Sequence, residues 1–240
     1  MVTRTQLHRG GTDRAFEGAA IHAAPGVHKK ALELMSREFK AGGRVADIGA
    51  GSGALSLRLQ RAGFRPVAVD LAIDSMPPGI EFVEANVCTS LVDALGEESV
   101  DDAVAVEVVE HLPDPIAFLR QAYSVIRPGG ALVLSTPNIL HPYSRLKFLL
   151  KGTYWLFDEE AYWTTGHTTP LPAWLLREHL AHTGYVRVEH GFAGDLELTP
   201  AKAIFARAVR PLAARPAGAL GLQGDGSTLF VVARKPAGVR

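Results

Sequence analysis

A glycine-rich turn is the first feature of the sequence whose residue types could do chemistry. Gly49, Gly51 and Gly53 follow an apolar run at every second position. Without side chains there, a ligand can lie against the main chain, where the first amides of a following helix have no partner. Asp70 ends the next apolar run, and a carboxylate at this place can accept hydrogen bonds from both hydroxyls of a ribose. The turn and Asp70 together predict a nucleoside-binding site.

The carboxylate of Asp47, at the start of this turn, separates two classes of cofactor. The dinucleotide fingerprint is Gly-x-Gly-x-x-Gly, and here the third glycine comes one residue early. A carboxylate would repel a pyrophosphate, whereas it suits the ammonium and sulfonium of S-adenosylmethionine. We therefore expect S-adenosylmethionine as the cofactor. A nicotinamide-dependent oxidoreductase and a non-catalytic nucleoside-binding module are the alternatives.

The elements that must position these residues alternate along the chain. Helical spacing of apolar residues follows Pro25-Gly26 and Gly53, and returns after Asp114 and after Pro170. Between these patterns lie short apolar runs typical of parallel strands covered on both faces, at 44–48, 66–70, 80–83, 103–106 and 131–135, followed by strand patterns at 185–189 and 227–234. This alternation predicts an α/β fold with a doubly wound, mostly parallel sheet.

Length and composition limit the remaining possibilities. The chain has 240 residues, with 25 Lys and Arg against 25 Asp and Glu, so no global field would hold a nucleic acid. The single Cys88 cannot form an internal disulfide, and no run of about 18 apolar residues is present. The polar start of the sequence is not expected to act as a secretory leader. We expect a cytoplasmic protein. The predicted organisation is an N-terminal arm over residues 1–24, loose or a partial lid, and a single domain over 25–240.

Residues 136–170 interrupt the alternation and predict a lid insertion, since long segments of this kind are usually functional. Residues 143–151 favour an amphipathic helix, and their basic and apolar character also admits a membrane surface or a lipid-linked substrate. Elsewhere a helix is predicted over 201–209 and a connector over 211–226. The lid mixes aromatic surface with hydrogen-bonding groups, as expected around an organic substrate: Asn138, His141, Tyr143, Arg145, Tyr154, Trp155, Tyr162, Trp163 and His167.

Four ordered blocks of sequence resemble the class I S-adenosylmethionine-dependent methyltransferases. They are VADIGAGSG at 45–53, VAVD at 67–70, DDAVAVEVVEHL at 101–112 and IRPGGALVLSTPN at 126–138. The resemblance covers about residues 25–191. The EVVEHLPDP and STPN stretches are most similar to the small-molecule O-methyltransferase branch that includes quinone-biosynthesis enzymes. Membership implies a Rossmann-like, seven-stranded sheet whose last strand is inserted antiparallel.

This resemblance also implies site residues. In the matching positions, the glycine turn and Asp47 line the methionine half of the cofactor, Asp70 binds the ribose and Glu107 lies near the transferred methyl group. An aspartate that reads the adenine amino group in many relatives is replaced here by Asn86, whose amide oxygen can still accept that bond. The implied cofactor-binding residues are Asp47, Gly49, Gly51, Gly53, Asp70, Leu71, Asn86, Val87 and Glu107.

Methyl transfer is an in-line displacement, so it requires alignment first and a base only for a protonated nucleophile. His111, after the fourth strand, is the first candidate for that base, Glu107 is grouped with it, and His167 is the second candidate. We expect an oxygen nucleophile on a small organic acceptor. Nucleic-acid methylation is disfavoured, because STPN at 135–138 stands where DNA amino-methylating enzymes have an Asn/Asp-Pro-Pro-aromatic element. We predict no metal; the alternative is a divalent cation on Glu107, Glu110 and His111.

Overall fold

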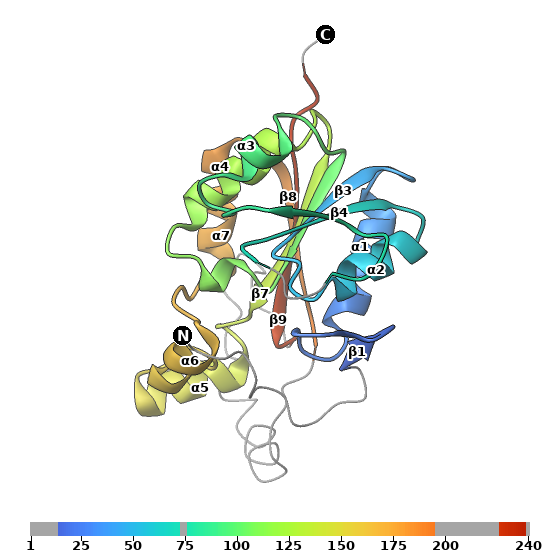
Figure 1. The fold of residues 1–240 in the computed structure, drawn as a ribbon. Helices are drawn as coiled ribbons and strands as arrows, with labels where there is room; N and C mark the ends of the chain where they lie inside the picture. The colour runs from blue at the N-terminus through green and yellow to red at the C-terminus, as the bar shows by residue number, and fades with distance from the viewer. Residues whose placement is uncertain (1–13, 73–75, 195–225, 239–240) are drawn as a thin grey trace.

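A seven-stranded mixed sheet forms the centre of the computed structural model, which describes residues 14–72, 76–194 and 226–238. The strand order is β5-β4-β3-β6-β7-β9-β8 (Figure 1). Within this sheet, strands β3 to β7 run parallel to one another, and β9 lies antiparallel to both of its neighbours. The strands are β3 (Arg44–Ile48), β4 (Arg65–Asp70), β5 (Glu81–Glu84), β6 (Asp102–Val106), β7 (Ala131–Pro137), β8 (Val186–Ala193) and β9 (Thr228–Arg234).

This arrangement confirms the predicted fold class, including the antiparallel last strand. β9 inserts between β7 and β8, with Ala131 opposite Arg234 at one end of the β7 pairing and Pro137 opposite Thr228 at the other. The chain order reverses between β3 and β6, since β4 and β5 extend the sheet on one side and β7 on the other. The carboxyl ends of strands at such a reversal leave a crevice in which α/β proteins bind ligands.

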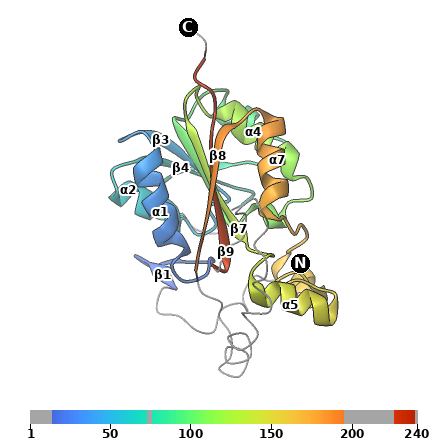
Figure 2. The same ribbon diagram turned by 180° about the vertical axis from the view of Figure 1, so that it is seen from behind.

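Helices cover both faces of the sheet (Figures 1 and 2). One face packs against α1 (Val27–Glu38) and α2 (Ala54–Arg61), and its core includes Met35, Leu59 and Phe230. The other face packs against α3, α4 and α7, and its core includes Phe118 and Leu176. Because both faces are covered, the inner strands β3, β6, β7 and β9 are buried along nearly their whole length, as the sequence predicts for strands in the middle of the sheet. The bounds of these three helices are Leu91–Leu95, Pro115–Val125 and Ala173–Thr183.

Local signals fix where α4 begins and ends. The side chain of Asp114 accepts a hydrogen bond of 2.9 Å from the Ala117 amide, and Pro115 occupies the first turn, where its missing amide is not needed. After the helix, the Gly130 amide donates to the Arg127 carbonyl at 2.9 Å, and Gly129 has φ of 83°. These are the features of a type II turn, so both local predictions are confirmed.

A short hairpin precedes α1, formed by β1 (Ala15–Phe16) and β2 (Ala19–Ala20). Glu17 and Gly18 both have positive φ, 48° and 89°, as a tight two-residue hairpin turn requires. Residues 1–24 are predicted from the sequence to be a loose arm or a partial lid. The described part of this arm, from residue 14 on, is an ordered hairpin followed by an extended segment that leads into α1.

The predicted lid region contains two helices, α5 (Pro142–Lys151) and α6 (Glu159–Thr165), so the helix expected over 143–151 is confirmed. The ammonium of Lys147 joins them by donating to the Tyr154 carbonyl at 2.9 Å and to Asp158 at 2.5 Å. The N-terminal hairpin and these helices lie at the same end of the sheet, on opposite sides (Figures 1 and 2). No described helix has the length and apolar character needed to cross a membrane. The predicted helix over 201–209 and the connector up to residue 225 lie outside the described residues.

Candidate active site

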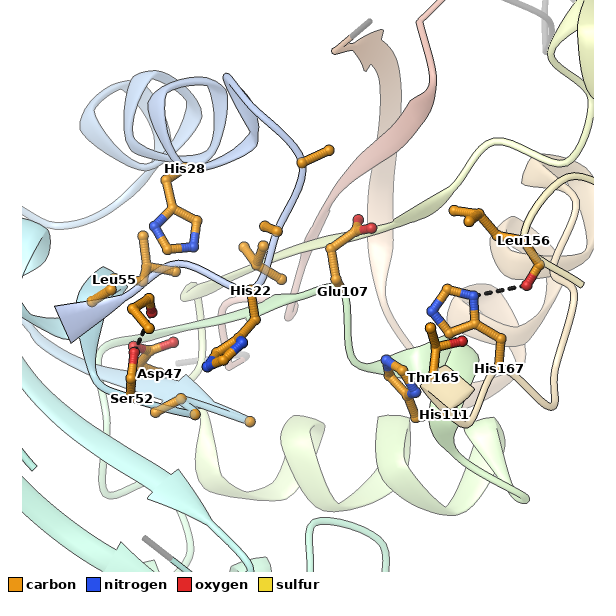
Figure 3. A pocket seen from close by; sticks show the side chains of 18 of the residues that line it. His22, His28, Asp47, Ser52, Leu55, Glu107, His111, Leu156, Thr165 and His167 are labelled. Atoms are coloured by element: carbon orange, nitrogen blue, oxygen red, sulfur yellow. Dashed lines mark hydrogen bonds between the residues drawn. The ribbon is translucent and has the colours of Figure 1, made fainter. Parts of the chain in front are cut away.

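A pocket opens at the carboxyl ends of β3 and β6, where the strand order reverses (Figure 3). Its walls come from segments that are far apart in the sequence: residues 20–28, the glycine turn with the start of α2, residues 106–111, and residues 156–167 of the lid. The residues from the lid end and from the glycine-turn end face one space. The predicted site residues that line it are Asp47, Gly49, Gly51, Glu107, His111 and His167.

The glycine turn is shaped by close packing beneath it and is open above it. Gly49 and Gly51 have φ of 75° and 55°, a left-handed conformation that strains other residues. A Cβ atom at Gly49 would lie 2.5 Å from a methyl carbon of Val108, so no side chain fits there. At Gly51 the nearest atom to such a Cβ is a ring carbon of His22, at 3.5 Å. The backbone at Gly51 is therefore accessible to a ligand, as the expected cofactor requires.

Asp70 is fixed beside this turn without lining the pocket itself. One carboxylate oxygen accepts from the Gly51 amide at 2.8 Å, and the other accepts from the Leu71 amide at 2.7 Å. Each oxygen keeps lone-pair capacity for a ribose hydroxyl. Among the expected adenine contacts, Leu71 is 61% exposed, and the side chain of Asn86 is exposed and accepts from the Cys88 amide at 2.9 Å. Val87 is part of the hydrophobic core, so its side chain has a packing role.

Asp47 carries the buried charge at the glycine-turn end. Burial raises the pKa of its carboxyl from 3.8 to about 6, and the nearby charge of Asp70 acts in the same direction. The hydroxyl of Ser56 opposes this shift by donating to Asp47 at 2.6 Å. Asp47 is thus ionised at pH 7 but poorly solvated. A cationic group placed in the pocket would stabilise this carboxylate, which fits the ammonium of the expected cofactor.

Glu107 lies between the two ends of the pocket, just after β6 (Figure 3). Its φ of 53° is unusual for a residue with a side chain and is held by Ser135 on the adjacent strand. The Ser135 hydroxyl donates to the Glu107 carboxylate at 2.8 Å and accepts from the Glu107 amide at 3.1 Å. Burial raises the pKa of Glu107, so its carboxyl can exchange a proton in the neutral range.

Two histidines meet at the lid end. The rings of His111 and His167 lie 4.8 Å apart between centroids, at 70° to each other. The segment after α6 brings them together, because the Thr168 and Thr169 amides both donate to the Glu110 carbonyl, at 2.9 and 3.0 Å. His111 Nδ1 lies 3.2 Å from the Gly166 carbonyl oxygen.

His167 is held in the same way as His111, with its Nδ1 2.9 Å from the Leu156 carbonyl oxygen. A carbonyl only accepts, so each of the two rings carries its hydrogen on Nδ1, and Nε2 is the basic nitrogen. Burial, with the neighbouring His111, lowers the pKa of His167 to about 4. His167 is therefore neutral at pH 7.

Glu110 completes a group that could bind a cation. Glu110, His111 and His167 each offer one ligand atom, and these atoms lie within 4.8 Å of one another. The carboxylate of Glu110 is fully buried with the Thr136 hydroxyl beside it, and burial with the nearby Glu107 charge raises its pKa well above the ordinary value. Glu107, part of the cation set considered from the sequence, is not in this group. The expectation of no metal stays a prediction.

Sequence reasoning missed part of the pocket. His22 and His28 line it next to the glycine turn, and Leu156, Thr164 and Thr165 line it from the lid. Nothing local distinguishes these side chains, since they become neighbours only through the packing of distant segments. The one available signal was the position of His22 and His28 on either side of the Pro25-Gly26 helix start, close to a predicted ligand-binding turn.

An open sheet with a glycine turn and a following strand-end aspartate defines a nucleoside-binding α/β protein, and comparison with known proteins narrows this class. A family described as a methyltransferase domain matches residues 21–190. The chain belongs to this family, which confirms the resemblance to S-adenosylmethionine-dependent methyltransferases and makes S-adenosylmethionine its cofactor.

The sequences of curated relatives agree with this assignment. The chain is 38% identical over 118 residues to a ubiquinone biosynthesis O-methyltransferase of Xanthomonas euvesicatoria pv. vesicatoria (strain 85-10), covering 45% of this chain and 48% of that protein. The chain thus spans about half the length of the curated relatives it matches.

The structural neighbours support the fold. A methyltransferase from Archaeoglobus fulgidus superposes with a TM-score of 0.60 at 19% identity, covering 87% of this chain and 94% of that one. A phosphoethanolamine N-methyltransferase from Haemonchus contortus superposes with 0.56 at 15% identity, covering 89% and 54%.

Proposed function

We propose that this methyltransferase transfers the methyl group to a hydroxyl oxygen of a small organic acceptor. The observation that carries the proposal is the His111–His167 pair, which places basic imidazole nitrogens at the lid end of a pocket whose other end is the glycine turn (Figure 3). A hydroxyl acceptor must lose a proton as it is methylated, and a positioned histidine is the side chain most often used for this step.

The residues at the glycine-turn end fit the cofactor. The backbone at Gly51 is open to the pocket, Asp47 offers a buried carboxylate to the ammonium group, and Asp70 offers carboxylate lone pairs to the ribose. The chemistry that S-adenosylmethionine supplies when bound is an electrophilic methyl group on a sulfonium. The protein residues must then align the acceptor and manage one proton.

His111 is the proposed base. Its Nδ1 hydrogen is directed to the Gly166 carbonyl, so Nε2 takes the proton of the acceptor hydroxyl. His167, whose pKa is lowered to about 4, stays neutral at pH 7 and positions the acceptor by accepting a hydrogen bond from it. Glu107, held by Ser135, orients the acceptor from between the two pocket ends. The histidine pair therefore divides proton removal and positioning between two residues.

The acceptor is an organic molecule with an apolar part. The name of the Xanthomonas relatives, ubiquinone biosynthesis O-methyltransferase, supports an oxygen nucleophile. Within the lid, α5 exposes Leu149 (80%) and Leu150 (65%), and α6 exposes Trp163. These side chains support access for acceptors that carry a lipid tail.

We further propose that residues 25–240 form one domain with a lid at 136–170. Core residues from both ends of this range, including Val27 and Val232, belong to a single cluster. We also propose a cytoplasmic location, which the single cysteine supports.

Two measurements test the proposed function. Calorimetric titration with S-adenosylmethionine, S-adenosylhomocysteine and NAD should give micromolar binding for the first two and none for NAD. Incubation of the protein and S-adenosylmethionine with catechols, other phenols and amines of similar size should then add one methyl group to oxygen, detected by mass spectrometry. Binding of NAD without either sulfur nucleoside would overturn the cofactor assignment. Methylation of the amines alone would overturn the oxygen nucleophile.

A further inference from the structure

The amino-acid end of the cofactor carries a carboxylate as well as an ammonium, and the pocket must provide for both. Burying a carboxylate without donors is costly, so a site that binds this end tightly needs a hydrogen-bond donor or a cation near it. Asp47 matches the ammonium and would repel the carboxylate. The described residues that line the pocket include no lysine and no arginine. Among them, the side chains that can become cationic are four histidines: His22, His28, His111 and His167.

These histidines fall into two groups on opposite sides of Glu107 (Figure 3). His111 and His167 lie at the lid end, where their Nδ1 atoms face the Gly166 and Leu156 carbonyls. His22 and His28 lie at the glycine-turn end with Asp47, Ser52 and Leu55. Only the second group is close to the turn along which the methionine half of the cofactor is expected to lie.

The positions of His22 and His28 suit a ligand at this turn. A ring carbon of His22 lies 3.5 Å from the place of a Cβ atom at Gly51, so the imidazole faces the most accessible part of the turn. His28 is buried in the first turn of α1 and lines the same end of the pocket. An imidazole can donate one charge-assisted hydrogen bond to a carboxylate. We propose that His22 and His28 bind the carboxylate of the methionine part of S-adenosylmethionine, an inference that rests on the proposed cofactor.

The segment that carries both histidines, residues 14–28, is fastened along one wall of the pocket and is here named the N-terminal strap. Arg61 of α2 forms two hydrogen bonds to Glu17, at 2.9 and 2.7 Å, and the Arg58 guanidinium lies 4.2 Å from the centre of the Phe16 ring. The Ser52 hydroxyl, in the glycine turn, donates to the Ala20 carbonyl. The strap is thus bound to the turn and to the helix that follows it.

The alternation of side chains after the hairpin directs His22 to the pocket. Ile21 and Ala23 are buried in the core between the strap and α1, whereas His22 between them is exposed. Successive side chains of an extended segment point to opposite sides, so anchoring Ile21 and Ala23 in the core places His22 over the glycine turn. The strap therefore completes the cofactor site with side chains that the glycine turn lacks.

Decarboxylated S-adenosylmethionine, which keeps the sulfonium and the ammonium, provides a direct test. Calorimetry gives the Kd of both ligands for the wild type, His22→Ala, His28→Asn and the control Lys29→Ala, an exposed neighbour on α1. The wild type and the control should bind S-adenosylmethionine at least tenfold more tightly than the decarboxylated ligand. Each histidine variant should lose about tenfold in affinity for S-adenosylmethionine, the effect of one lost charge-assisted hydrogen bond, and keep its affinity for the decarboxylated ligand.

The outcomes separate this inference from the proposed function. Variants that discriminate between the two ligands as well as the wild type does would overturn the carboxylate role of the histidines and leave the cofactor assignment in place. A wild type that binds neither ligand would overturn the cofactor assignment and the inference with it. Thermal unfolding of each variant controls for damage to the fold. Because His22 is exposed, His22→Ala decides the question if the buried position 28 does not tolerate replacement.

Discussion

Replacing Asp47 by Asn should make the cofactor-free protein more stable and its cofactor binding weaker. The carboxyl has a pKa of about 6 in the folded chain against 3.8 ordinarily, so folding favours its protonated form. Above pH 6 the folded state holds a poorly solvated carboxylate that the unfolded state solvates freely. The pKa difference between the folded and unfolded states is about 2.2 (6 − 3.8). At about 1.36 kcal/mol for each pKa unit, the ionised carboxylate lowers the free energy of unfolding by about 3 kcal/mol.

An asparagine at position 47 removes this cost and keeps an oxygen that can accept from the Ser56 hydroxyl. At pH 8 the free energy of unfolding without ligand should rise by up to about 3 kcal/mol, which is about 6 to 12 °C in Tm for a chain of this size. The gain should shrink as the pH falls from 6 towards 4, because the wild-type carboxyl then takes up its proton. Urea unfolding followed by circular dichroism at pH 4.5, 6 and 8 measures it.

The same substitution should lower the affinity for S-adenosylhomocysteine about tenfold to a hundredfold, since an amide faces the ammonium in place of a carboxylate. In the wild type, the affinity should fall below pH 6 as Asp47 is protonated. Ser56→Ala should move that midpoint upward, because the Ser56 hydroxyl stabilises the ionised form. An Asp47→Asn protein that is less stable without ligand, or that binds as tightly as the wild type, would refute the reasoning.

Three other predictions address separate parts of the site. His111→Ala should reduce turnover about 10²- to 10⁴-fold with unchanged affinity for S-adenosylhomocysteine, whereas the exposed control His182→Ala keeps full turnover; equal rates would remove His111 as the base. Asp70→Ala should weaken cofactor binding by about 1–3 kcal/mol in calorimetry, and unchanged affinity would contradict its ribose role. Arg61→Ala, which releases Glu17, should increase the dissociation rate of S-adenosylhomocysteine in stopped-flow fluorescence with little effect on Tm; an unchanged rate would contradict the role of the strap in completing the cofactor site.

The strands and turns that surround the site follow from local sequence signals. The buried run at 44–48 matches β3 residue for residue, because a parallel strand covered on both faces reads as a continuous apolar segment. The helix cap at Asp114 and the turn at Gly129 were also predictable from the sequence, because each depends only on residues that are neighbours in the chain. The number of strands and the antiparallel last strand came from the family resemblance and are confirmed.

The two walls of the pocket could not be predicted from local signals. β1 and β2 have two residues each, too few for an alternating pattern to stand out, so the strap was missed together with His22. The meeting of His111 with His167 depends on hydrogen bonds from Thr168 and Thr169 to the Glu110 carbonyl, which link residues more than fifty positions apart. Such contacts are set by packing of the whole chain, and local patterns in a single sequence do not predict them.

The insertion of β9 between β7 and β8 has a consequence for synthesis on the ribosome. A nascent chain that ends before residue 228 already contains the glycine turn, the strap and both lid helices, but β7 still has an unpaired edge and β8 has no neighbour in the sheet. An apolar edge of this kind is prone to pairing with other chains. Because β9 is synthesised after the other strands of the sheet, it is the strand that joins β8 to β7 and completes the sheet. Chaperone binding during synthesis should therefore persist until residues 228–234 emerge from the ribosome.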